Sequence, residues 1–508
     1  MPERREASSP TGIGLFDRRR LLGLAATATG FIGAAGPRAL AQMAPMGASH
    51  TASSTGAADY ALRIARGLVE LGPDTIVSTT LYNGQFPGPL LRFTEGKQVA
   101  IDVHNDTDTP ELVHFHGEFL PAAADGAAEE GSPYIPAHGM RRLVFMPRPT
   151  GFRFYHTHLP AYSDLSRGLY SGQAGPVYVE PRREPGAYDR EVFLTLKEFA
   201  PYFTRTEMPD DFLAPETVDP ELKEASEKAE KASADAGNPQ GYELAYNFMS
   251  INGRMLGHGE PIRVKAGERV LFHVLNASAS ENRSLALPGH VFKVVALDGN
   301  PVPHPAEVPV LWLGTAERIS AIVEMNRPGV WVLGDTDNDD RAHGMGIVVE
   351  YADAKGDPQW EKPPEFRWDY RLFASSDAAA QKPDQTIVMT ISTRGGALQG
   401  FDEFAINGVP FSMAKMEPMF RLSRGRRHRL QLRNATDDVH PIHLHRHSFE
   451  ITSIMGQPTA GVIKDVAMLG AFQEMTVDFT ADQPGLSLFH CHMQPHMDFG
   501  FMALFNCV

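Results

Sequence analysis

The chain has 508 residues, a formal net charge of -15 at pH 7, and 42% hydrophobic residues. This length suggests two to four domains, and the hydrophobic content excludes a disordered chain because it is sufficient to build full cores. The acidic balance and the lack of a dense basic stripe exclude a nucleic-acid-binding surface.

The first 41 residues have the features of an export signal. Arg18, Arg19 and Arg20 precede an apolar, alanine-rich run over residues 21–35, and a small-residue cleavage site follows at 39–41. The run is too short for a stable membrane anchor. The paired arginines resemble a twin-arginine signal, so we expect the twin-arginine export machinery as a partner and a periplasmic or secreted protein. An ordinary secretory signal is the alternative.

The rest of the chain repeats one pattern three times. In each repeat a glycine is followed nine residues later by an asparagine, with an apolar, strand-like run between them. The pairs are Gly96 and Asn105, Gly267 and Asn276, and Gly425 and Asn434. A period of about 160 residues is too long for a solenoid unit. Short alternating strands with frequent Gly and Pro predict three β-sandwich domains, over residues 58–183, 187–353 and 365–508.

One segment departs from the β pattern. Residues 219–237 are rich in Lys, Glu and Ala, and they predict either a charged helix or a mobile loop inserted early in the second domain. A solvated surface insertion is the favoured interpretation, and a lid over a substrate site is the alternative.

Histidines recur on alternate residues far more often than chance predicts. The chain has 20 histidines, for which random placement gives fewer than one His-x-His pair. The five pairs are 114/116, 156/158, 443/445, 445/447 and 490/492. The first and third repeats carry histidine pairs at equivalent positions, whereas the second repeat has Leu285, Leu287, Gly334 and Thr336 there.

This distribution predicts a metal cluster between the first and third domains. Residues on alternate positions of a strand share one face, so each pair presents two imidazoles together. Eight imidazoles are too many for one ion and fit three ions with two or three histidines each. Imidazole suits Cu, Zn, Fe and Ni. We expect the middle domain to act only as a spacer.

Cys491 predicts a second metal centre. In a strand it faces away from His490 and His492, toward His440 and His496, which are close to these motifs in the sequence. Two imidazoles and one thiolate form the trigonal blue-copper set. The equivalent positions are Thr157 and Asp335, so only one such centre is expected. A zinc hydrolase is disfavoured because His-Glu-x-x-His and Cys-x-x-Cys are both missing from the sequence.

These motifs strongly resemble those of the multicopper oxidases, in their three-domain laccase-like branch. The matching segments are 114–117, 156–158, 440–445 and 490–496. The resemblance implies an all-β chain of three cupredoxin-like Greek-key β-sandwich domains that holds four copper ions. It implies type 1 copper on His440, Cys491 and His496, type 2 on His114 and His443, and type 3 on His116, His156 and His492 and on His158, His445 and His490.

Two departures from the family pattern and one match to it refine the resemblance. Phe501 stands at the axial position of type 1 copper and cannot coordinate, which implies a three-coordinate ion with a raised potential. Met502 lies one residue beyond the axial position, and on a strand its side chain would face the other way. Asp125 stands where the family has an acid that serves the cluster, so it is the candidate proton relay, with an ordinary turn aspartate as the alternative. Met497 stands where many bacterial relatives have an acid that is a second proposed proton relay.

The resemblance implies an oxidase that takes single electrons from phenols or aromatic amines, through Cys491, and reduces dioxygen to water. The alternative is a cuprous oxidase for copper tolerance, and a copper-free cell-envelope scaffold is less favoured. Met413, Met416 and Met419 could bind Cu(I), but packing is the favoured interpretation. Residues 337–340 predict an exposed acidic turn rather than a cation site. We expect a monomer whose partners are a small-molecule reductant and dioxygen.

Overall fold

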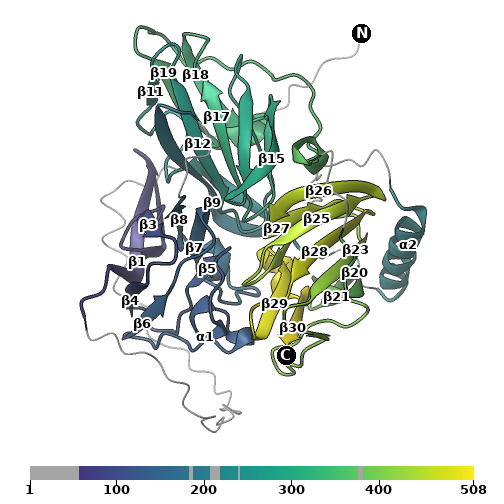
Figure 1. The fold of residues 1–508 in the computed structure, drawn as a ribbon. Coiled ribbons are helices and arrows are strands. Elements are labelled where there is room, and N and C mark those ends of the chain that lie inside the picture. The colour runs from purple at the N-terminus through teal and green to yellow at the C-terminus, as the bar shows by residue number, and fades with distance from the viewer. Residues whose placement is uncertain (1–55, 182–186, 206–217, 238–240, 376–380) are drawn as a thin grey trace, which may run out of the picture. The chain divides into compact units, whose positions relative to one another are not determined.

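The computed structural model describes residues 56–181, 187–205, 218–237, 241–375 and 381–508. The predicted export signal, residues 1–41, lies outside these ranges, as do residues 182–186 at the predicted boundary of the first two domains. The described residues form six sheets that fall into three pairs along the chain (Figure 1).

The first pair of sheets covers residues 60–180. Its sheets have the strand orders β2-β1-β4-β6 and β3-β8-β7-β5. The strands are β1 (Tyr60–Gly72), β2 (Thr75–Tyr82), β3 (Leu91–Thr94), β4 (Val99–Asn105), β5 (His114–His116), β6 (Gly139–Phe145), β7 (Gly151–His156) and β8 (Ala174–Glu180). Two short helices, α1 (Ala122–Asp125) and η2 (Ala128–Glu130), lie between β5 and β6 in the chain.

The second pair covers residues 190–351. Its sheets have the orders β10-β9-β12-β17-β14-β15 and β11-β19-β18-β13-β16. The strands are β9 (Arg190–Thr204), β10 (Glu243–Ile251), β11 (Ile262–Val264), β12 (Arg269–Asn276), β13 (Arg283–Ala286), β14 (Phe292–Leu297), β15 (Asn300–Val308), β16 (Leu311–Leu313), β17 (Arg318–Glu324), β18 (Val330–Asp335) and β19 (Gly346–Tyr351).

The third pair covers residues 385–507. Its sheets have the orders β21-β20-β23-β28-β25-β26 and β22-β30-β29-β24-β27. The strands are β20 (Gln385–Leu398), β21 (Phe401–Ile406), β22 (Phe420–Leu422), β23 (Arg427–Ala435), β24 (His440–Leu444), β25 (Phe449–Ile454), β26 (Gln457–Lys464), β27 (Val466–Leu469), β28 (Glu474–Thr480), β29 (Gly485–Cys491) and β30 (Met502–Cys507).

The repeated glycine and asparagine have the same structural role in all three pairs of sheets. The glycines have φ between +71° and +79°, which favours glycine in the turn before β4, β12 and β23. Each asparagine is fully buried near the end of its strand, and its amide donates to two or three backbone carbonyls. The three strands also pair in parallel with β1, β9 and β20 respectively. The sequence repeat therefore reflects one recurring sheet topology.

The charged insertion forms a helix, α2 (Pro220–Asp235), rather than a loop. Asp219 caps its N-terminus by accepting from the backbone N–H groups of Glu221 and Leu222. Leu222 and Ser226 are its buried residues, and the helix packs against β20 and β23 of the third pair (Figure 1). Its apolar contact is therefore with the domain that follows the one in which its sequence lies.

Two smaller expectations need correction. Packing does not explain Met416, because 40% of its surface is exposed. The predicted acidic turn at 337–340 is the start of a short helix, α3 (Asn338–Ala342), which Asp337 caps, and Asp340 forms an ion pair with the buried Arg283. These two acids thus have structural partners within the chain.

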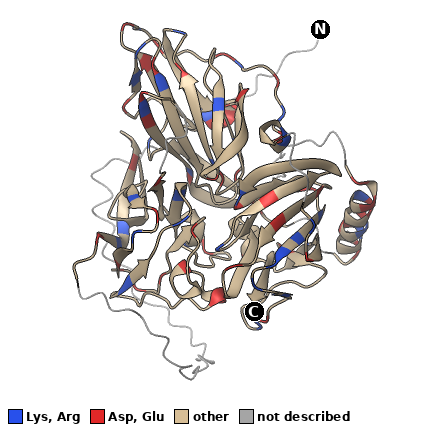
Figure 2. Cartoon of the chain, viewed as in Figure 1, with Lys and Arg blue, Asp and Glu red and all other residues tan. Residues whose placement is uncertain are grey.

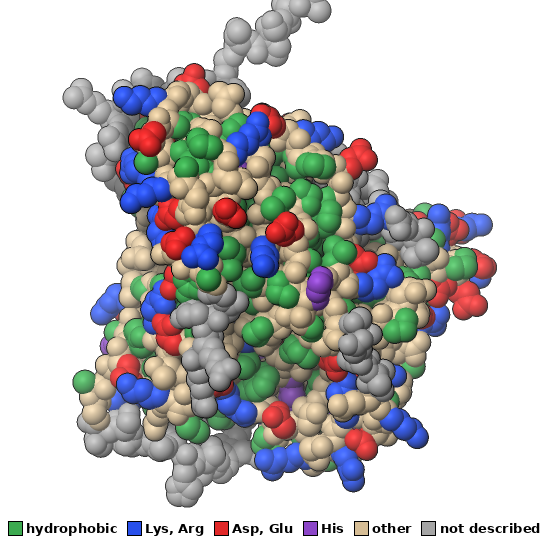
Figure 3. Space-filling view, turned by 45° about the horizontal axis from the view of Figure 1, so that its top comes forward, with side chains coloured by type: hydrophobic (Ala, Val, Ile, Leu, Met, Phe, Trp, Pro, Cys, Tyr) green, Lys and Arg blue, Asp and Glu red, His purple; other side chains and the backbone are tan. Residues whose placement is uncertain are grey.

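The charged side chains are mixed in sign. Figure 2 shows Lys and Arg interspersed with Asp and Glu over the strands, and helix α2 carries both signs. On the face in Figure 3, charged side chains of both signs alternate with small hydrophobic patches. Within the described ranges, no helix is long and apolar enough to cross a membrane.

Candidate metal centres

The eight predicted cluster histidines lie together between the first and third pairs of sheets. They come from β5, β7 and the second residue beyond β7 on one side, and from β24, β29 and the residues just after these strands on the other. All eight are at most 3% exposed. His114 stands opposite His156 in the β5–β7 ladder, and His443 stands opposite His490 in the β24–β29 ladder. The equivalent strands of two domains thus place matching pairs face to face.

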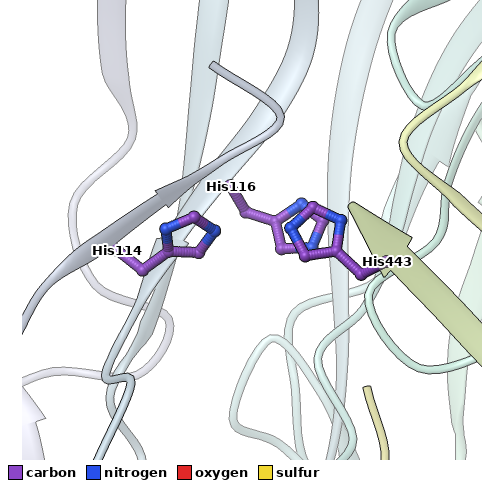
Figure 4. A group of neighbouring side chains, drawn as sticks. All are labelled: His114, His116 and His443. Atoms are coloured by element: carbon purple, nitrogen blue, oxygen red, sulfur yellow. The ribbon is translucent and has the colours of Figure 1, made fainter. Parts of the chain in front are cut away.

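The imidazoles fall into three groups whose potential ligand atoms lie within 4.8 Å of one another. The groups are His114, His116 and His443; His116, His156 and His492; and His158, His445 and His490. His116 belongs to two groups, so these two groups adjoin. Figure 4 shows His114 and His116 on one side, facing His443 from the other. The structure therefore brings together each predicted type 3 set, and the predicted type 2 pair with His116.

Hydrogen bonds fix which ring nitrogen is available to a metal. The Nδ1 atoms of His114, His156 and His443 lie 2.7–2.8 Å from backbone carbonyl oxygens. A carbonyl only accepts, so each Nδ1 carries the proton and each Nε2 keeps its lone pair. These three Nε2 atoms are buried and have no hydrogen-bond partner. Buried lone pairs without a donor fit metal ligation.

The ring nitrogens of His445 and His490 support the same conclusion. The Nε2 atoms of His445 and His490 are 3.0 Å apart. The Nδ1 of His445 donates to the Asp125 carboxylate, and the Nδ1 of His490 donates to the Cys491 carbonyl, both at 2.8 Å. Two lone pairs then face each other, which is unfavourable unless a cation lies between them. This donor set fits a shared metal ion.

Burial also keeps the histidines in their metal-binding form. Burial lowers the pKa of His490 to about 3, and burial together with neighbouring imidazoles lowers the pKa of His443 well below its usual range. The His490 and His443 rings are therefore neutral at pH 7, which is the form that binds metal.

The second predicted centre is also assembled. His440 on β24 and Cys491 on β29 meet His496 on the short helix α4 (Gln494–Asp498). The two Nδ1 atoms are 3.1 Å apart, and they lie 3.6 and 3.5 Å from the Cys491 Sγ. A point equidistant from the three atoms lies about 2.0 Å from each, close to a metal–imidazole bond of about 2.0 Å. Cys491 faces away from both flanking histidines, as predicted.

The ring of His440 is oriented by a hydroxyl group. Thr436 Oγ1 donates to Asn434 Oδ1 at 2.8 Å, so it accepts from His440 Nε2 at 2.7 Å. Nδ1 of His440 is therefore unprotonated and points toward Cys491. Burial raises the pKa of the Cys491 thiol, so a bound metal ion would have to displace its proton.

Phe501 lies beside this centre and is fully buried. Its ring centroid is 4.9 Å from that of His440, and its carbonyl accepts from the Cys491 N–H at 3.3 Å. Met502 packs instead with Leu488 and Leu504, in a separate hydrophobic cluster. The alternation expected for a strand thus puts phenylalanine, and not methionine, next to Cys491.

Replacing Phe501 with Met is expected to lower the reduction potential of this centre. A thioether can coordinate weakly and stabilise the oxidised ion, whereas a phenyl ring cannot. The expected change is about 59 mV, a tenfold shift in a one-electron equilibrium. Redox titration of the blue absorbance measures it. Phe505→Met is the matched control, since Phe505 is equally buried further along β30. An unchanged potential in Phe501→Met would contradict the axial assignment.

Asp125 lies against the histidine cluster at the end of α1 and is fully buried. Its Oδ2 is 2.8 Å from His445 Nδ1 and 3.1 Å from His114 Nδ1, and its backbone carbonyl accepts from His114. Its Oδ1 has no hydrogen-bond partner. Asp125 therefore contacts one histidine from each side of the cluster.

Two further acids near the cluster were not predicted. Glu129 Oε2 lies 3.8 Å from His158 Nδ1, and Glu130 Oε1 lies 3.5 Å from His445 Nδ1. Both are on η2 and at most 5% exposed. Burial raises the pKa of Glu129 to about 7. The sequence signal was the density of acids from 125 to 130, but nothing in the sequence shows that they are buried.

A cavity of about 720 Å³ opens beside His496. Residues of the second and third pairs of sheets line it, including Trp312, Phe401, Phe499 and His496. Its charged lining consists of nine acids and one lysine, Lys362. No residue of α2 lines it, so the structure gives no support to the lid interpretation.

Comparisons with known proteins agree with this architecture. Three family models, each described as multicopper oxidase, match residues 66–184, 222–350 and 381–507. The multicopper oxidase MmcO of Mycobacterium tuberculosis is 30% identical, over 98% of this chain and 97% of its own length. The bilirubin oxidase of Albifimbria verrucaria is 26% identical, over 84% of this chain and 72% of its own.

Solved structures share the fold at lower identity. A multi-copper oxidase from Pseudomonas thermotolerans aligns with a TM-score of 0.64 at 24% identity, covering 89% of this chain and all of its own. Fet3p, a multicopper oxidase that functions in iron import, aligns with a TM-score of 0.70 at 17% identity, covering 88% and 90%. The predicted fold class, three cupredoxin-like β-sandwiches, is confirmed.

Proposed function

The chain belongs to the multicopper oxidases, and on that premise we propose that it oxidises phenols or aromatic amines at the centre of His440, Cys491 and His496. Four one-electron oxidations and four protons balance the reduction of one dioxygen to two waters, which we assign to the histidine cluster. One observation carries the proposal: the tripeptide 490–492 contributes Cys491 to one centre and both flanking histidines to the other.

Copper bound at both centres would supply the one-electron chemistry. We propose four ions. The type 1 ion would be held by His440, Cys491 and His496. The type 2 ion would be held by His114 and His443, and the type 3 ions by His116, His156 and His492 and by His158, His445 and His490. The grouping of ligand atoms and the free Nε2 lone pairs support this assignment.

The chain itself offers two short routes between the centres. Cys491 is covalently bonded to His490 and His492, and the Cys491 carbonyl also accepts from the His490 ring at 2.8 Å. The electron donor would bind in the cavity beside His496, where the aromatic side chains of the lining can pack against the aromatic ring of the donor. Asp125, which touches His445 and His114, is the proposed proton relay.

A second candidate function is cuprous oxidation for copper tolerance. The observation that favours it is the acidic lining of the cavity, because nine carboxylates and one lysine attract cations. Met413, Met416 and Met419 do not line this cavity, so they give no support to a methionine route into it. The third candidate, a copper-free scaffold, conflicts with a complete and buried set of ligand atoms.

Oxygen uptake with a neutral phenol and with Cu(I), each as sole donor, separates the two functions. We expect the phenol to sustain turnover with a KM that changes little with salt. If Cu(I) is also oxidised, its KM should rise several-fold between low and physiological ionic strength, because salt screens the acidic lining. Oxygen uptake with Cu(I) but not with the phenol would contradict the phenol proposal. No oxygen uptake with either donor would contradict both functions.

We further propose that residues 1–41 direct export by the twin-arginine machinery, to the periplasm or the medium, and that the exported protein is a monomer. The support is the arginine pair followed by an apolar run and a small-residue cleavage site. Expression with Arg18 and Arg19 changed to Lys, followed by cell fractionation, tests it. Unchanged export of the variant would contradict the twin-arginine assignment.

A further inference from the structure

A buried ionic network joins the three β-sandwiches behind the histidine cluster. The first contributes Arg153 from β7, the second contributes Asp298 and Arg318, and the third contributes Lys464 and Asp465. All five side chains are fully buried. Unpaired charges are costly in such a place, so the contacts among these groups are expected to be tightly defined.

Arg318 holds Asp465 by a two-point contact. Its Nη1 donates to Asp465 Oδ1 at 2.7 Å, and its Nη2 donates to Asp465 Oδ2 at 2.6 Å. Arg153 adds a donor to Oδ2 at 3.0 Å. Asp298 accepts from the backbone N–H groups of Arg318 at 3.0 Å and of Asp465 at 3.2 Å. Both ends of the pair are therefore fixed by further hydrogen bonds.

Asp465 in turn contacts two cluster histidines. Its backbone carbonyl accepts from His443 Nδ1 at 2.7 Å, and its Oδ1 lies 3.3 Å from His116 Nδ1. The rings of His116 and His443 stack with their centroids 3.7 Å apart. One aspartate thus orients a histidine from the first domain and a histidine from the third.

Arg318 also contacts His116 directly. Its Nη1 lies 3.4 Å from His116 Nδ1, farther than from Ala316 O at 2.9 Å and Asp465 Oδ1 at 2.7 Å. The Nδ1 atom of His116 thus faces both Arg318 and Asp465, on the opposite side of the ring from Nε2. That Nε2 is buried and has no hydrogen-bond partner.

We propose that Arg318 is a positioning residue for the metal cluster, acting through Asp465 on His116 and His443. The middle domain is therefore more than the spacer that the sequence predicted. It contributes no ligand among the described histidine groups, yet it supplies the guanidinium that orients two of the ligands. Packing of the three domains against one another is coupled in this way to formation of the metal cluster. The inference rests on the proposed function only in taking copper as the ion.

The test is Arg318→Lys in the full-length protein. Lysine keeps the positive charge but is a point donor that cannot bind both carboxylate oxygens. Loss of an outer hydrogen-bond partner of a ligand commonly costs about 10- to 100-fold in metal affinity. We expect the cluster ions to be lost at about 10- to 100-fold lower chelator concentration, as measured by copper content and the EPR signal of the non-blue copper. The blue absorbance of the Cys491 centre should persist.

Arg283→Lys is the matched control, because Arg283 is equally buried in the middle domain and pairs with Asp340 away from the cluster. Equal chelator sensitivity in the two variants would overturn the proposal, and so would parallel loss of both copper centres in Arg318→Lys. If that variant does not fold, Arg318→Gln, which can still donate to one oxygen, is measured in the same way. Wild-type protein without copper would contradict the proposed function instead.

Discussion

The Cys491→Ser variant is expected to lose blue absorbance and to oxidise phenolic donors more than about 1,000-fold more slowly than the wild type. That loss corresponds to about 4 kcal/mol at about 1.36 kcal/mol for each tenfold. A serine hydroxyl does not form the soft thiolate ligand that the trigonal centre needs. The substitution also removes the sulfur that joins this centre to His490 and His492. Stopped-flow oxidation and oxygen uptake measure the loss.

Cys507→Ser is the control for this prediction. Cys507 is the other cysteine of the chain, is 4% exposed on β30 within a hydrophobic core, and its thiol donates a hydrogen bond to the Ala481 carbonyl. We expect wild-type absorbance and turnover in the control. Phenol oxidation at the wild-type rate in Cys491→Ser, or its loss in Cys507→Ser alone, would contradict the placement of the donor-side centre.

The Asp125→Asn variant is expected to turn over about 100-fold more slowly at neutral pH while keeping its copper. The amide has the shape of the carboxylate and can still accept from His445 Nδ1, but it cannot take up and release a proton. Positioned acids and bases typically contribute about 10²- to 10⁴-fold. The defect should shrink at acidic pH, where protons from solvent are abundant. Turnover at saturating phenol and copper content are the measurements.

Asp335→Asn serves as the matched control for the relay. Asp335 is a buried aspartate of the middle domain, at the position equivalent to Cys491, and its carboxylate accepts from Ser284 and from the backbone N–H of Asp337. Asp335 also lines the cavity beside His496, so a change in its variant is expected only in the donor KM, and turnover at saturating donor should equal that of the wild type. If Asp125→Asn also turns over at the wild-type rate, Asp125 is not the relay. If it loses copper, its role is to orient His445 and His114.

Local geometry explains why the grouping of the candidate ligand side chains could be predicted from the sequence. Alternation along a strand decides that His490 and His492 face one way and Cys491 the other, and that Phe501 rather than Met502 lies beside the thiol. The buried repeat asparagines mark equivalent strand ends, so counting from them identified equivalent histidines in two domains. These relations depend on a few covalent bonds and on one repeated topology.

The parts that the sequence did not reveal depend on contacts between distant segments. Arg318 reaches Asp465 across 147 residues, and Arg153 reaches it across 312. No local pattern distinguishes these charges from surface charges. The packing of η2 against β29 places Glu129 and Glu130 beside His158 and His445, and no local pattern in the sequence predicts that these two acids are buried. The sequence could not decide between a helix and a loop for residues 219–237. The reason is that helix α2, with Leu222 buried, packs against β20 and β23 of the following domain.

Copper content measured together with visible absorbance, in the wild type and in Cys491→Ser, tests most directly whether one tripeptide joins two copper centres. We predict four copper ions per chain and blue absorbance in the wild type, and three ions without blue absorbance in the variant. Loss of all copper from the variant, or equal copper content and equal absorbance in the two proteins, would contradict two separate centres joined through residues 490–492.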